Sequence, residues 1–298
     1  MKMKPLLYTL LACGLIAATA MAQEQPDLTI KCSDVKVKVA GALETDAYAI
    51  NNKNAIAGDY IDSSSVQHGM IMKGKIVTSF DGPAGSTSIA AYGINTAGVV
   101  VGWYLDSSGT PQSFSYAKGT FSSVAFPGAA YTEANGINDP GWIVGTYVDS
   151  SGNTHGFYWD TKTYHSIDIP GASYTVAWAI NNNKLMTAYD VSTSSCLPID
   201  GYTYDGTTFT KIDPPGSAGT AIHGINNKGD IDFTIFDSSN NRHGVLYQKS
   251  TGVFTQYDDS KGVNTTRADG INDKDTMVGR YSPASGNPAN AGFKCTVK

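Results

Sequence analysis

The sequence predicts an all-β fold, a six-bladed β-propeller in which an N-terminal strand completes the last blade. Three observations lead to this prediction. The tripeptide Gly/Ala-Ile-Asn recurs six times along the chain. Each recurrence except the last is followed by segments that complete a set of four short strands. The sixth copy lacks the fourth segment, and a segment of matching character stands near the N-terminus.

The asparagine of the tripeptide sets the period of the repeat. The six asparagines are separated by 44, 43, 43, 45 and 46 residues. They are Asn51, Asn95, Asn138, Asn181, Asn226 and Asn272. A period in the forties with four strands per copy is typical of propeller blades. A β-helix, whose repeats supply fewer strands per turn, is the alternative architecture.

The third copy shows the four strands most clearly. The first strand ends at Gly136-Ile137-Asn138, and the second is expected over Ile143–Tyr147. A turn over Asp149–Gly152 leads to a third strand over His155–Trp159, and the fourth is expected over Tyr164–Asp168. Alternating aromatic and β-branched residues bounded by Gly, Pro, Asn and Asp are the signature of such strands.

The ring is expected to close through the N-terminus. The sixth copy has three strands, over Arg267–Asn272, Thr276–Tyr281 and Gly292–Val297. The segment Val35–Gly41 alternates valine with lysine, as a half-buried strand does. Counting back from the first asparagine places Val37 at the position of Ile167 in the third copy. We therefore predict that Val35–Gly41 is the fourth strand of the sixth blade.

Two cysteines are expected to lock this closure. Cys295 occupies the position of Trp159, and Cys32 aligns near Lys162, in the turn between the third and fourth strands. Across one hairpin the two lie within reach of a disulfide, which an exported protein can form. Cys196 has no such partner and is interpreted as a buried thiol.

The N-terminus predicts export. Basic residues at Met1–Lys4 precede an apolar run over Leu6–Ala20 and a small-residue site at Ala22. This pattern is typical of a secretory signal peptide over residues 1–22, which leaves residues 23–298 as a single propeller domain in the periplasm or outside the cell. The alternative is a lipoprotein cleavage box ending at Cys13.

Composition and motifs exclude several function classes. The chain carries a net charge of −5, only 16% charged residues and no basic run, which argues against nucleic-acid partners. No run after the signal is long and apolar enough to suggest a membrane span. The sequence also lacks the common hydrolase, metalloprotease and phosphate-binding motifs. We expect a monomer without a cofactor or a metal.

Positions that differ among the copies are the candidates for a binding site. The residue four positions before each asparagine is mostly small. The residues three and five positions before the asparagine vary among the copies. In a propeller the first strand of each blade lines the central channel. The ligand-binding candidates are Tyr48, Tyr92, Glu133, Asn135, Trp178, His223, Arg267 and Asp269. Aromatic and polar groups that converge in this way suit a small-molecule or sugar site; ordinary solvated channel residues are the alternative.

A second variable set lies on the second strands. It comprises Asp59, Trp103, Thr146, Tyr189, Thr234 and Arg280. This set is expected to be the weaker candidate, because the second strand lies farther from the axis.

Recurring His-Gly pairs and Asp-led turns are interpreted as structural. His68, His155 and His243 occur at equivalent places in different blades and should therefore lie far apart. The turn aspartates lack further carboxylates at calcium-ligand spacing and are expected to cap their own turns. These aspartates are Asp62, Asp106, Asp149 and Asp237.

The repeat pattern G-I-N-x-x-G-x-I-V-G-x-Y-x-D-x-x-G-x-x-H-G-F, followed by F-x-x-I-D-x-P-G-A, resembles the bacterial extracellular HAF-repeat family. The match spans nearly the whole chain after residue 22. It is degraded in the fourth copy, over Leu185–Asp200, and in the fifth, where Asp232-Phe233 replaces Val-Gly. The resemblance implies an exported repeat protein and no particular activity.

Three functions are compatible with these observations. The leading hypothesis is a non-catalytic binding module for a glycan or a cell-surface partner, favoured by the aromatic-rich channel positions. The second is a channel-mouth enzyme, such as a polysaccharide lyase or hydrolase, with His223, Asp269, Glu133 and Arg267 as acid–base candidates. The third is a structural envelope protein, which a narrow and filled channel would favour.

Overall fold

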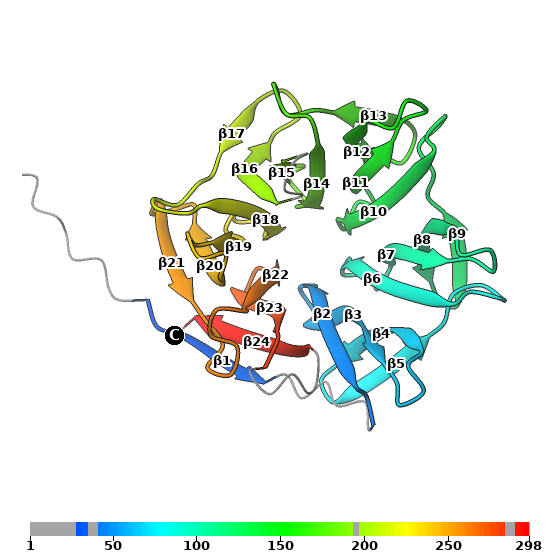
Figure 1. The fold of residues 1–298 in the computed structure, drawn as a ribbon, viewed down its shortest axis with the longest axis horizontal. Coiled ribbons are helices and arrows are strands. Elements are labelled where there is room, and N and C mark those ends of the chain that lie inside the picture. The colour runs from blue at the N-terminus through cyan, green and yellow to red at the C-terminus, as the bar shows by residue number, and fades with distance from the viewer. Residues whose placement is uncertain (1–27, 35–40, 193–196, 284–289, 298) are drawn as a thin grey trace, which may run out of the picture.

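The protein is a ring of six four-stranded antiparallel sheets (Figure 1). The computed structural model describes residues 28–34, 41–192, 197–283 and 290–297. The predicted signal peptide and its alternative at Cys13 lie outside these residues, as does Cys196. The described parts of the chain contain no helix with the length and hydrophobicity that a membrane span requires.

The first five blades each use four consecutive strands, and the innermost strand of each comes first in sequence (Figure 1). Blade 1 contains β2 (Glu44–Ile50), β3 (Ala55–Ile61), β4 (Gln67–Lys73) and β5 (Ile76–Phe80). Blade 2 contains β6 (Ser88–Ile94), β7 (Val100–Leu105), β8 (Pro111–Ala117) and β9 (Thr120–Ser123). Blade 3 contains β10 (Tyr131–Ile137), β11 (Ile143–Val148), β12 (Thr154–Trp159) and β13 (Tyr164–Ile167).

The remaining blades follow the same order. Blade 4 contains β14 (Thr175–Ile180), β15 (Met186–Val191), β16 (Pro198–Tyr204) and β17 (Phe209–Lys211). Blade 5 contains β18 (Gly219–Ile225), β19 (Ile231–Phe236), β20 (Arg242–Gln248) and β21 (Val253–Tyr257). Blade 6 contains β22 (Arg267–Ile271), β23 (Thr276–Tyr281), β24 (Ala291–Val297) and β1 (Ile30–Asp34). The predicted six-bladed propeller is therefore confirmed.

An N-terminal strand completes blade 6, as predicted, but the strand that the structure describes there precedes the predicted segment Val35–Gly41. The strand that pairs with β24 is β1, and the predicted segment over 35–40 lies outside the described residues. Cys32 stands directly opposite Cys295, as Tyr164 stands opposite Trp159 in blade 3, and not in the preceding turn. The register is thus displaced by two residues. A displacement of two residues keeps every side chain on its face, so alternation of side chains could not detect it.

The predicted disulfide between Cys32 and Cys295 is present and joins residues 263 apart in sequence. Cys295 is fully buried and belongs to an apolar cluster that also contains Phe293 and Ile30. The bond therefore ties the first described strand to the last strand of the chain from within the core of blade 6.

Apolar side chains between neighbouring blades form the core. Phe114, Phe157 and Phe293, from the third strands of three blades, are at most 1% exposed. Phe157 packs over Gly145 of β11, where an added Cβ would lie 1.9 Å from the Glu133 carbonyl oxygen. Glycine is required there because the two inner strands approach so closely.

In the fifth copy the large side chain comes from the second strand and the smaller one from the third strand. Phe233 occupies the glycine position on β19, and its partner on β20 is the smaller Val245. Both side chains are buried. The degraded motif of this copy therefore preserves the volume of the core.

The repeated asparagines link each blade to the next. Each side-chain Nδ2 donates to the backbone oxygen of the equivalent asparagine in the following blade. The donor–acceptor distances are 2.8, 3.2, 3.1, 2.9, 3.3 and 3.1 Å around the closed ring. Each Oδ1 also accepts the backbone N–H four residues later, for example that of Trp142 at 2.8 Å from Asn138. This explains why the asparagine is retained in all six copies.

We expect Asn138→Ala to lower the free energy of unfolding by about 1–3 kcal/mol, because buried hydrogen-bonding groups lose their partner. Asn153→Ala is the matched control, since its Nδ2 bonds only the exposed turn residue Asp149. Denaturant unfolding of both variants measures the difference. Equal stabilities would contradict a role for the asparagine ring.

Candidate functional site

Each inner strand contains a β-bulge at the position identified as variable. The register with the second strand shifts on either side of one extra residue in all six blades. The extra residues are Tyr48, Tyr92, Asn135, Trp178, His223 and Asp269. A bulge bends the strand and redirects a side chain. The bulges thus explain how one residue of each blade is available to the channel.

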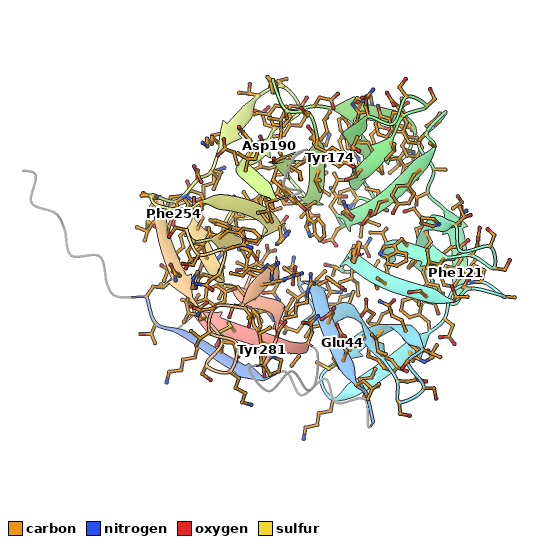
Figure 2. All side chains as sticks on the ribbon, in the orientation of Figure 1. Glu44, Phe121, Tyr174, Asp190, Phe254 and Tyr281 are labelled. Carbon is orange, nitrogen blue, oxygen red and sulfur yellow. A yellow bond between two sulfur atoms is a disulfide. The ribbon has the colours of Figure 1, made fainter. Side chains whose placement is uncertain are left out.

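The channel is narrow and is divided into levels. At the end where the inner strands finish, here the Asn51 end, a cavity of about 80 Å³ is bordered by asparagines and a ring of six isoleucines. A second cavity of about 70 Å³ is bordered by the same isoleucines and by all the bulge residues except His223. The opposite opening, here the Glu44 end, lies where the inner strands begin. Figure 2 shows side chains of the inner strands extending into the space between them.

The structure brings four predicted residues into one contiguous aromatic arc. The ring centroids of Tyr48 and Tyr92 are 4.8 Å apart, and those of Tyr92 and Trp178 are 5.6 Å apart. The Trp178 centroid lies 4.8 Å from that of His223. Tyr48 and His223 are buried, whereas Tyr92 and Trp178 remain partly exposed. The arc therefore presents the faces or edges of two rings to solvent.

Asp269 joins this arc through a buried ion pair. Its Oδ2 lies 3.2 Å from Nη1 of Arg280, whose guanidinium carbon is 4.5 Å from the Tyr48 ring centroid. Tyr48 in turn donates a hydrogen bond of 3.0 Å to Asp46. Burial raises the pKa of Asp269 to about 6, although Arg280 and Arg267 act in the opposite direction. Burial also raises the pKa of Asp46.

Three buried acceptor atoms in this region have no hydrogen-bond partner among the described residues. They are Oδ1 of Asp46, Oδ1 of Asn135 and Oδ1 of Asp269. Asn135 uses its Nδ2 to bond the Ala177 carbonyl oxygen at 3.0 Å, and His223 uses Nδ1 to bond that of Ala268 at 2.7 Å. The region is therefore rich in acceptors, and a bound molecule that supplies hydroxyl donors would satisfy them.

The last two predicted residues lie two positions before the bulges, toward the Glu44 end. Glu133 accepts a hydrogen bond of 2.9 Å from Tyr131, and burial raises its pKa. Arg267 stands opposite Arg280 in the sheet and is partly exposed. Neither side chain forms a hydrogen bond or an ion pair with the aromatic arc among the described residues. Burial, followed by the charge of Glu133, raises the pKa of Tyr92, and the charge of Arg267 opposes the rise in the pKa of Asp269.

The expectation that the second strands contribute little is corrected by the structure. Arg280 holds Asp269, and Nε1 of Trp103 donates a hydrogen bond of 2.7 Å to the Tyr92 hydroxyl. Asp59 is 2% exposed and stands opposite Asp46. Burial is the larger cause, and the charge of Asp46 the next, of a pKa of Asp59 well above its usual range. The variability of these positions among the copies was the signal that could have identified them.

The His-Gly pairs are structural elements at the turns. His155 lies 2.8 Å from Asp168 through Nδ1 and 3.5 Å from Asp149 through Nε2. Oδ1 of Asp149 accepts the backbone N–H groups of Ser151 and Asn153, so this aspartate caps its own turn. Within the described residues, no group of three or more His, Cys, Asp or Glu side chains could hold a metal ion.

We expect His223 to make the stability difference between the protein and a His223→Gln variant depend on pH. Burial lowers the pKa of His223 to about 3, so below pH 6.5 the unfolded chain binds a proton that the folded chain does not. The protein should therefore lose stability relative to the variant as pH falls from 6.5 toward 4, by up to about 1.4 kcal/mol per pH unit. Denaturant unfolding at several pH values measures this; a constant difference would refute it.

Comparisons with known proteins identify the fold. No protein-family model matches the sequence, and no curated protein is significantly similar to it. A lectin from Aleuria aurantia in complex with Fucα1-6GlcNAc shares 12% identity at a TM-score of 0.52, covering 85% of this chain and 94% of its own. The SapL1 lectin in complex with α-methyl fucoside shares 10% identity at a TM-score of 0.54, covering 86% of this chain and 95% of its own. TolB from Acinetobacter baumannii shares 12% identity at a TM-score of 0.55, covering 81% of this chain and 63% of its own.

Proposed function

We propose that the protein is an exported glycan-binding β-propeller whose ligand contacts the Glu44 end of the central channel. The observation that carries this proposal is the combination of partly exposed Tyr92 and Trp178 with the unpartnered acceptors of Asp46, Asn135 and Asp269. A sugar offers an apolar C–H face to an aromatic ring and hydroxyl donors to carboxylate and amide oxygens. The two chemistries are adjacent here.

Further observations support the proposal. Several solved structures with this fold are lectins with bound fucosides. The disulfide between Cys32 and Cys295 fits an oxidising compartment, in agreement with the signal peptide expected over residues 1–22. Membership of the HAF-repeat family is likewise proposed, on the repeat pattern alone. Because the cavity beside the bulge residues measures only about 70 Å³, the sugar ring is placed at the opening, and only a hydroxyl group or a bridging water reaches the buried oxygens.

We expect Trp178→Ala to weaken glycan binding about tenfold or more, because an aromatic face at the centre of a small site carries much of the affinity. A glycan array identifies the ligand, and calorimetric titration of the purified protein measures the loss. Trp142→Ala is the matched control, since this tryptophan stacks on Tyr158 away from the bulge residues. Tyr92→Ala provides a second test. Unchanged binding in both channel variants would exclude this location.

A second candidate function is polysaccharide cleavage at the same opening. A carboxyl group with a pKa of about 6, such as that of Asp269, can transfer protons near neutral pH. His223 is a poor general base near neutral pH because burial lowers its pKa to about 3. Turnover on a polysaccharide panel that Asp269→Asn abolishes would favour cleavage. A structural role is the third candidate, which the filled channel favours and which requires that no glycan bind.

A further inference from the structure

The largest cavities among those described lie away from the channel, between blades 4 and 5. One measures about 290 Å³ and is bordered by Leu185, Thr203 and Thr210 from blade 4 and by Ile231 and Tyr247 from blade 5. A second, of about 260 Å³, adjoins it and shares Leu185, Asp205, Gly229 and Lys249 with the first. Each alone approaches the lower end of the size range of small-molecule sites, roughly 300–1,000 Å³, and the two adjoin.

The preceding blade interface shows larger side chains in the equivalent space. In blade 3, Trp142 stacks on Tyr158 with ring centroids 5.6 Å apart, and Tyr158 stacks on His165 at 4.4 Å. From blade 4, the Lys184 ammonium lies 4.4 Å from the Trp142 ring centroid. Three aromatic rings and a long side chain therefore occupy the space between blades 3 and 4.

Small residues stand at the same repeat positions between blades 4 and 5. Counted from the repeated asparagine, Leu185 replaces Trp142, and Gly229 replaces Lys184. The strand registers show that Thr203 and Thr210 replace Tyr158 and His165. Relative to the interface between blades 3 and 4, four positions therefore carry less volume, and the cavity lies where the larger side chains would stand.

The lining combines an apolar floor with polar groups of both kinds. Leu185, Ile231 and Tyr247 provide apolar surface, and threonine hydroxyls can donate or accept. Asp205 uses Oδ1 to cap its own turn, through the backbone N–H groups of residues 207 and 208, which leaves Oδ2 available. Within the part of the chain that the structure describes, the Lys249 ammonium has no ion pair.

The charges on this lining balance each other. Lys228 borders the second cavity, but it is paired with Asp230 and Asp275. This leaves one available carboxylate oxygen, from Asp205, and one available ammonium group, from Lys249. A site with one acceptor and one donor of opposite charge suits an uncharged ligand with many hydroxyl groups better than an ion.

We propose that the cavity between blades 4 and 5 is a second glycan site that binds one uncharged hexose unit. The sugar ring lies against Tyr247 and Leu185, and its hydroxyl groups bond Asp205, Lys249 and the threonines. This inference rests on the proposed glycan-binding function but concerns a different site from the channel opening. A chain with two such sites gains avidity for a long or branched glycan.

Methyl NMR of the full protein tests the two sites separately. Glucose, galactose, mannose and fucose are titrated one at a time while the methyl signals of Leu185, Ile212 and Ile231 are followed. We expect saturable shifts of these signals with at least one sugar. Thr203→Tyr, which restores the residue of blade 3, should weaken this binding at least about tenfold, whereas Trp178→Ala should leave it unchanged.

Two surface variants guard against a folding defect in Thr203→Tyr. Asp205→Asn retains the turn cap and Lys249→Met retains the stem, and each should weaken the same sugar without changing stability. Absence of shifts with all four sugars, or shifts that persist in Thr203→Tyr, would overturn the second site. If those outcomes occur while Trp178→Ala still reduces binding on the array, the proposed function stands. Pocket shifts without any effect of Trp178→Ala would instead remove the channel opening as a site.

Discussion

Replacing Arg280 with methionine is expected to lower the free energy of unfolding by about 3–5 kcal/mol, the cost of leaving a buried charge without its partner. The Arg280 side chain is 13% exposed and that of Asp269 is 1% exposed. Oδ1 of Asp269 and Oδ1 of Asp46 already lack hydrogen-bond partners among the described residues. Without Arg280, the nearest remaining guanidinium is that of the more exposed Arg267.

A double-variant cycle separates the ion pair from packing. Asp269→Asn in the Arg280→Met background removes the unpaired charge, and we expect it to recover most of the lost stability. Arg242→Met is the matched control, because Arg242 lies over the Phe236 ring and holds no carboxylate among the described residues. Denaturant unfolding measures the four proteins of the cycle, including Asp269→Asn alone, and the control. A loss below about 1 kcal/mol for Arg280→Met would place this pair among weak surface pairs.

Removing the disulfide with Cys32→Ala and Cys295→Ala is expected to cost about 2–5 kcal/mol. The bond closes a loop of 263 residues and holds β1, which has no other neighbour in its sheet than β24. In a protein of this size the loss corresponds to a fall in Tm of roughly 5–15 °C. Calorimetry of the two proteins measures the shift.

Reduction provides the control for this prediction. Dithiothreitol should lower the Tm of the unmodified protein toward that of the double variant and leave the variant unaffected. Limited proteolysis should then release β1 faster than any other strand, since the disulfide holds β1 to β24. An unchanged Tm after reduction would mean that strand pairing alone closes the ring.

The repeat made most of the fold predictable. Six asparagines at a nearly constant spacing, together with the alternation around Ile143–Tyr147 and His155–Trp159, gave strands that agree with the structure to within about one residue of β11 and β12. The register of β1 was not predictable to the same degree, because a slip of two residues preserves both the alternation and the burial of each face.

The candidate residues could be selected from the sequence, but their geometry could not. Variation among copies identified Tyr48, Trp178 and Asp269 before any coordinates, since positions that are free to vary are free to form a site. The bulge at each of them has no sequence signature of its own, so the reach of Arg280 into the channel could not be foreseen. The cavity beside Thr203 was not predicted, because Thr203 and Thr210 lie on the third and fourth strands of the copy whose motif is degraded.

A crystal structure of the protein with an oligosaccharide selected on a glycan array is the most direct test of the proposed function. The account predicts a sugar ring against Tyr92 or Trp178 at the Glu44 end of the channel, with a hydroxyl group bonded directly or through one water to Oδ1 of Asp46, Asn135 or Asp269. A glycan bound to any other surface, with this opening holding only water, would contradict it.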